Sequence, residues 1–118
     1  MTVGQIADKI NQVVTKFEIE VMGRGPKQIN TIINRDLIII RLEGFFSVAE
    51  KSLAQNGEVA QVKKLRTLLF ENEIENLKSL ITEIIDCQIK SIHSDVSTET
   101  GEKVIVISVN EDLEKKYS

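Results

Sequence analysis

The chain has few of the residues that build disulfide, metal and cofactor sites. Its 118 residues include one cysteine, one histidine, one proline and no tryptophan, and aromatic residues make up only 4%. A single cysteine excludes an intrachain disulfide and a cysteine metal cluster within one chain. We therefore expect neither a metal nor a cofactor, and a core built from isoleucine, valine and leucine.

Long hydrophobic runs and a basic charge excess are also missing. The longest apolar runs are LIII at Leu37–Ile40 and VIVI at Val104–Ile107, whereas a membrane-spanning helix needs about 20 apolar residues. The N-terminus lacks the pattern of a signal peptide. The formal net charge of −3 disfavours a nucleic-acid binder. We expect a cytoplasmic protein that binds no nucleic acid and does not insert directly into membranes.

What the chain does contain is periodic apolar residues, 42% of the total. Helical spacing predicts a helix over Val3–Met22 that ends at Gly23 and Pro26, because glycine favours helix ends and proline cannot continue a helix. Its apolar stripe consists of Ile6, Ile10, Val13, Val14, Phe17 and Val21.

A β-hairpin is predicted next, over 27–34 and 37–44, with turn residues between the two strands. Leu37–Leu42 is apolar on both faces apart from Arg41, as is typical of a central strand. A short helix should follow Phe45 and Phe46, with Ser47 as its N-cap and Glu50 at capping-box spacing.

The segment Glu58–Ile85 has helical periodicity throughout. Its apolar stripe, with a one-residue slip, consists of Val62, Leu65, Leu69, Phe70, Ile74, Leu77, Ile81 and Ile84, while Lys63, Lys64 and Arg66 lie on a solvated face. As one helix of 28 residues it would be about 42 Å long and would overhang a domain about 35 Å across. The alternative is a break near Glu71–Glu73 that folds the segment back as two helices. The overhanging stripe predicts a homodimer.

A second hairpin is predicted over Gln88–Val96 and Lys103–Val109, with Gly101 in its turn. Residues 109–118 form a polar tail that frays or makes one helical turn. The order is then α-ββ-α-α-ββ over one domain, residues 1–118. We predict an α+β fold in which a four-stranded antiparallel sheet carries its helices on one face.

Two places are candidate binding sites. The GRGP stretch is a helix stop at Gly23 and Pro26, or an anion cradle that uses Arg24 and the amides of the glycines Gly23 and Gly25. The second candidate is the pair formed by the only histidine and a nearby aspartate, discussed next.

His93 and Asp95 precede a turn rich in hydroxyl groups. Such a pair can act as a general base, but Cys87 would lie about 20 Å from His93 on a regular strand, and a third member is missing. We therefore predict no catalytic residue and no enzymatic activity. Ser97, Thr98 and Thr100 are expected to bond the turn backbone. Lys103 should face Asp95 across the ladder, and His93 should be half-buried.

These stretches together resemble the MpsC-like family of small bacterial soluble domains. The resemblance rests on GRGP, LIIIRLEG, Val48–Lys51 and IHSDVSTETGEKVIVIS, and it covers about Ile6 to Asp112. One departure is that Asp86 and Cys87 stand where we expect a glycine to close the long helix.

The resemblance implies association with a bacterial system that moves cations or inorganic carbon across the membrane. The chain would then be a soluble accessory component with a membrane-protein partner. Since the residues already predict a homodimer and no catalytic residue, we expect a non-enzymatic, homodimeric accessory protein. The alternative is a sensor that binds a small anion at Arg24 and Gly25 or near His93 and Asp95.

Overall fold

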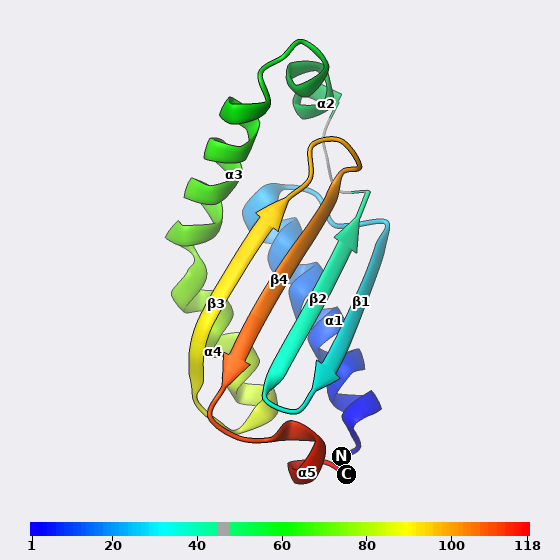
Figure 1. Cartoon of the computed structure of the whole chain (residues 1–118), viewed down its shortest axis with the longest axis vertical. Coiled ribbons are helices and arrows are strands. Elements are labelled where there is room, and N and C mark those ends of the chain that lie inside the picture. The colour runs from blue at the N-terminus through cyan, green and yellow to red at the C-terminus, as the bar shows by residue number, and fades with distance from the viewer. Residues whose placement is uncertain (45–47) are drawn as a thin grey trace.

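The computed structural model describes residues 1–44 and 48–118. Their order of elements confirms the predicted α+β class (Figure 1). The elements are α1 (Val3–Met22), β1 (Gln28–Asn34), β2 (Leu37–Glu43), α2 (Val48–Gln55), α3 (Val59–Asn72), α4 (Ile74–Ile85), β3 (Ile89–Val96), β4 (Glu102–Val109) and α5 (Leu113–Lys116). The predicted N-cap Ser47, like Phe45 and Phe46, lies outside the described residues.

The four strands form one antiparallel sheet in the spatial order β1-β2-β4-β3. This order makes β2 a central strand, as predicted, and leaves β1 and β3 as edges. α1 and α4 cover one face of the sheet, α3 runs beside β3, and α2 stands beyond the end of the sheet (Figure 1). The opposite face, toward the viewer in Figure 1, is here called the open face.

The first helix begins and ends at local signals in the sequence. The Oγ1 atom of Thr2 accepts a hydrogen bond from the amide of Gln5, whose Oε1 atom accepts one from the amide of Thr2. This reciprocal capping box satisfies two amides that no helical partner can reach. At the other end, Gly23 adopts a φ of 78° and donates its amide to the carbonyl of Ile19.

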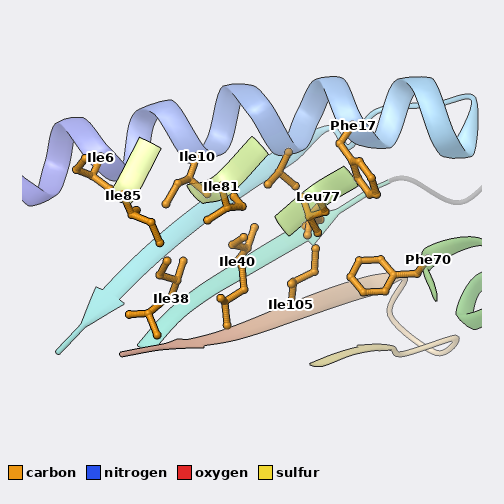
Figure 2. Packing of buried hydrophobic residues seen from close by; sticks show 14 of the residues in the cluster. Ile6, Ile10, Phe17, Ile38, Ile40, Phe70, Leu77, Ile81, Ile85 and Ile105 are labelled. Atoms are coloured by element: carbon orange, nitrogen blue, oxygen red, sulfur yellow. The ribbon is translucent and has the colours of Figure 1, made fainter. Parts of the chain in front are cut away.

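The core lies between the covered face of the sheet and the helices α1 and α4. Figure 2 shows Ile6 and Ile10 of α1 and Ile81 of α4 pointing toward Ile38 and Ile40 of β2, and all five are fully buried. Aliphatic residues therefore provide most of the packing, as expected. The aromatic part is small: the rings of two phenylalanines, Phe17 and Phe70, meet edge to face at 6.4 Å.

The segment Glu58–Ile85 forms two helices rather than one. α3 ends at Asn72 and α4 begins at Ile74, so Glu73 marks the break at the slip in the stripe. The two helices do not fold back on each other: α3 runs beside β3, and α4 continues from it behind the sheet (Figure 1). The molecule is consequently elongated, with extents of 47 × 23 × 22 Å.

The inward face of α3 differs from the prediction. Val62, Arg66 and Phe70 are buried, whereas Leu65 is 50% exposed. The prediction that Leu65 faces the core and Arg66 faces solvent is therefore wrong. The three buried residues are spaced four apart, and a helix places such residues on one side. Arg66 occupies this inward position because an acidic partner, described below, compensates its charge.

The C-terminal segment docks on the body of the protein. α5 is the single helical turn that we predicted as one of two alternatives, and its Leu113 is fully buried in the core. The hydroxyl of Tyr117 donates a hydrogen bond of 2.6 Å to the carbonyl of Ile85 at the end of α4. Asp86 closes α4 in the left-handed conformation, with a φ of 48°.

Candidate functional site

The predicted pair His93 and Asp95 lies on the open face of the edge strand β3. Cross-strand pairing puts His93 opposite Val106 and Asp95 opposite Val104. Both side chains are exposed, so the expectation of a half-buried histidine is wrong. The reason is the register: in a strand, alternate residues face opposite sides of the sheet, and this histidine falls on the side without helices.

The hydroxyl-rich turn beyond Asp95 organises its own backbone. Ser97 and Glu102 pair through the amide of Ser97 and the carbonyl of Glu102, and Gly101 donates its amide to the carbonyl of Ser97. The hydroxyl oxygens of Ser97 and Thr100 accept hydrogen bonds from the amides of Thr100 and Glu102. Gly101 has a φ of 74°, a conformation that glycine adopts without steric cost. Thr98 lines a shallow hollow between this turn and α3.

The hollow beside this turn is poorly suited to an anion. Its ionic side chains are those of Lys63 of α3 and of Asp95, Glu99 and Glu102. The ammonium of Lys63 lies 3.6 Å from a carboxylate oxygen of Asp95. Three carboxylates and one ammonium line the hollow, so its net charge disfavours an anion.

The GRGP stretch lies toward the other edge of the sheet, since it leads into β1. The amide of Gly23 is engaged in capping α1, so one amide of the predicted cradle is occupied. A Cβ atom on Gly25 would come within 2.9 Å of the side chain of Ile19. Gly25 therefore permits the close approach of this loop to α1. The structure does not bring Arg24 and Gly25 together with His93 and Asp95.

The sequence analysis missed a buried ion pair between α1 and β4. The Nζ atom of Lys103 lies 2.6 Å from Oε1 of Glu18, and the two side chains are 2% and 0% exposed. Lys103 pairs across the ladder with Val96, not with Asp95, so our prediction for it is wrong. Its Nζ atom also lies 4.7 Å from the ring centroid of Phe70.

Burial lowers the pKa of the Lys103 ammonium, because its lost hydration outweighs the attraction and the hydrogen bond of Glu18. Arg66 adds a smaller repulsion in the same direction. Arg66 has its own partner, since two of its guanidinium nitrogens donate to Glu50 of α2 at 2.5 and 2.6 Å. This bidentate pair ties α2 to α3.

A sequence signal for these pairs exists. Glu18 follows Phe17 on the apolar stripe of α1, and Arg66 stands between Val62 and Phe70 at a spacing of four. Lys103 falls on the inward alternation of β4, ahead of Ile105, Ile107 and Val109. A charged residue at a position where the period demands an apolar one indicates a buried pair, because an unpaired buried charge is very costly.

The open face of the sheet carries an extended row of apolar side chains. A row of side chains crosses the open face from Ile32 of β1 through Ile39 of β2 to Val106 of β4. Leu37 and Val104 extend it on either side. Ile32 is 49% exposed, the other four are half-buried, and none of the five packs against the core. We call these five residues the apolar row.

The chain's only thiol is not poised for chemistry. Cys87 is half-buried ahead of β3, and burial raises the pKa of its thiol, outweighing the opposing effect of Lys116. A raised pKa reduces the reactive thiolate. Over residues 1–44 and 48–118, no three His, Cys, Asp or Glu side chains are grouped to hold a metal ion. Within the same ranges, no helix combines the length and hydrophobicity required to cross a membrane.

Comparison with known proteins identifies the family of this chain. Residues 2–111 match the family model described as "Na+-translocating membrane potential-generating system (MpsC)". The chain belongs to the MpsC family. It is 38% identical over 113 residues to the uncharacterized protein YbcI of Bacillus subtilis strain 168, covering 95% of this chain and 91% of that one. No solved structure matches it.

Membership of the MpsC family confirms the resemblance inferred from the motifs. The structure also explains the departure noted at the end of the long helical segment. Asp86 takes the left-handed conformation expected of a glycine, and its amide donates to the carbonyl of Thr82. The helix of this MpsC-family chain therefore ends where a glycine would end it, at some cost in backbone strain.

Proposed function

We propose that the protein is a non-enzymatic accessory protein of the cytoplasm that binds a membrane-protein partner through the open face of its sheet. The apolar row is the observation that carries this function. An antiparallel sheet covered on one face is normally polar on the other. Here Ile32, Ile39 and Val106 stand side by side on the solvent face. Contiguous apolar surface of this kind marks interaction sites.

The charges around the apolar row favour a protein surface over lipid. Arg41 and Asp95 are exposed on the open face, beside Glu43 and Glu102. A surface that binds anionic lipid carries clusters of lysine and arginine, whereas this face has mixed charges with an acidic excess. An apolar centre with a polar rim of both signs is the usual composition of a protein–protein interface.

The buried ionic groups support a structural role rather than catalysis. The carboxylate of Glu18 bonds Lys103, and that of Glu50 bonds Arg66. Each pair neutralises its own charge within the fold and connects separate elements. A general acid or base must reach a substrate proton within hydrogen-bond distance, and Glu18 and Lys103 are sealed from solvent.

The partner class follows from the family. The family description names a Na+-translocating, membrane potential-generating system, and a component that lies outside the bilayer needs a surface with which to dock on the membrane part. The open face supplies a surface of that kind. We expect this system to move cations or inorganic carbon across the membrane.

Site-specific photocrosslinking in cells tests this function. A photoreactive residue at Ile39 should give an adduct with a protein of the membrane fraction, and the same residue at exposed Lys9 of α1 should not. Adding Ile32→Lys should abolish the Ile39 adduct. His93→Ala should abolish no chemical activity of the protein, because we predict that His93 is not catalytic. Adducts of equal yield from Ile39 and Lys9, or adducts only with soluble proteins, would refute the proposed function.

A further inference from the structure

The outer side of α3 carries a second, separate apolar surface. Leu65 and Leu68 are 50% and 51% exposed. They belong to a concentration on α2 and α3, because the large hydrophobic side chains exposed among the described residues are Met1, Ile19, Ile32, Leu53, Val59, Leu65 and Leu68. Most of that set therefore lies on two of the helices. Figure 1 shows α3 at the edge of the molecule, outside β3.

The exposed leucines have the spacing of a helix-pairing seam. Gln61, Leu65, Leu68 and Asn72 are separated by four, three and four residues, and Gln61 and Asn72 are also exposed. Residues at these intervals form one stripe that meets a neighbouring helix in knobs-into-holes packing. We call these four residues the α3 seam. It is apolar at its centre and polar at both ends.

Charged residues flank the seam in a self-complementary way. Lys64 and Glu71 are exposed and seven residues apart, so both lie on the same side of the seam. In an antiparallel pair of identical helices, a two-fold axis midway between Leu65 and Leu68 sets each Leu65 against the other chain's Leu68. The same axis brings Lys64 of each chain beside Glu71 of the other.

We propose that the α3 seam is the contact between two copies of this chain, packed antiparallel about a two-fold axis. In parallel packing, the Lys64 and Glu71 side chains of the two copies would lie on opposite flanks of the seam and could not pair with each other. The two-fold antiparallel arrangement brings these opposite charges together, and it lets Gln61 bond Asn72 at each end. The surface that matches the charges and the polar ends of the seam is therefore the same seam on a second copy of the chain.

The size of the contact sets the expected affinity. α3 has 14 residues and is about 21 Å long. Two such helices bury less than the roughly 1,200 Å² of a standard stable interface. We therefore expect a reversible dimer with a dissociation constant in the micromolar range.

Sedimentation equilibrium of the full chain tests the contact, from about 5 to about 500 micromolar. The mass should rise from the 13.3 kDa of one chain toward twice that value. Leu68→Lys should abolish the rise. Ile32→Lys is the matched control, since Ile32 is 49% exposed and Leu68 51%. It should dimerise like the unaltered chain.

Charge reversal tests the antiparallel geometry independently. Lys64→Glu and Glu71→Lys should each weaken association at least about fivefold, because each change creates two repulsive pairs. The double variant should restore it. Circular dichroism confirms that each variant is folded. A chain that stays at the mass of one copy, a dimer broken by Ile32→Lys but not by Leu68→Lys, or a double variant weaker than both single ones would overturn the contact.

Discussion

Replacing Lys103 by methionine should strongly destabilise the protein. The change removes the ammonium that lies 2.6 Å from Oε1 of Glu18 and keeps a flexible apolar side chain above the ring of Phe70. Glu18 is fully buried, and its second oxygen, Oε2, has no hydrogen-bond partner among the described residues. The variant therefore retains a sealed carboxylate that has lost its counter-charge.

The magnitude follows from two opposing terms. Unit charges 2.6 Å apart attract each other by about 6 kcal/mol at an effective dielectric constant of about 20. Burying both ions costs several kcal/mol each, so the intact pair contributes little net stability. Removing one partner loses the attraction but leaves the cost of burying Glu18. We expect a loss of about 3–5 kcal/mol, a large part of the roughly 5–15 kcal/mol that stabilises a typical domain.

Urea unfolding followed by circular dichroism measures this loss. The control is Lys63→Met, because the Lys63–Asp95 pair is solvent-exposed and exposed pairs contribute at most about 1 kcal/mol. The double variant Glu18→Leu/Lys103→Met removes both charges and should recover most of the loss. A decrease below about 1 kcal/mol for Lys103→Met, or a double variant no more stable than the single one, would refute this account of the pair.

Three further predictions concern backbone conformation and the docked C-terminus. Asp86→Gly should stabilise the protein by about 0.5–1 kcal/mol, because Asp86 has a φ of 48° and glycine adopts positive φ without strain; an unchanged urea midpoint would contradict this. Gly101→Val should destabilise by roughly 1 kcal/mol or more, because a β-branched residue resists the φ of 74°; thermal melting checks it. Tyr117→Phe should cost about 1 kcal/mol at neutral pH through loss of the bond to Ile85. Burial raises the pKa of Tyr117, so the folded state retains the phenol proton longer than the unfolded state, and native stability should fall as pH rises above about 10. The Tyr117→Phe variant should lack that fall, which denaturation at a series of pH values measures.

Local pattern was sufficient for most of the fold. The stripe of α1 and the two hairpins are set by neighbours in sequence, and a period of 3.6 or 2 identifies them without knowledge of the rest. Even the break in Glu58–Ile85 has a local signal, since the stripe slips near Glu73. The direction of α4 after the break has no such signal, because it depends on packing against α1 and the sheet.

Register is where the prediction of the candidate site failed. Lys103 was expected opposite Asp95, but the turn at Ser97–Gly101 pairs Lys103 with Val96 and Asp95 with Val104. A shift of one residue reverses the face of every side chain in a strand. Asp95 therefore points to the open face, while Lys103 points to the helices and reaches Glu18. The prediction paired Lys103 with Asp95 because this opposite charge is close in sequence. In the structure Lys103 instead pairs with Glu18, which is 85 residues away in the chain.

The two proposed surfaces predict a measurable coupling. The apolar row lies on the open face, while the α3 seam lies on a helix beside the sheet edge (Figure 1), so one chain has room for both contacts. A dimer then presents two open faces, and partners held together in a membrane bind it twice, at a high effective concentration. Leu68→Lys, which leaves the apolar row intact, should therefore speed the release of the protein from partner-containing membranes. An unchanged release rate for a Leu68→Lys chain shown to be monomeric would mean that each open face binds alone, and that pairing through α3 serves another purpose.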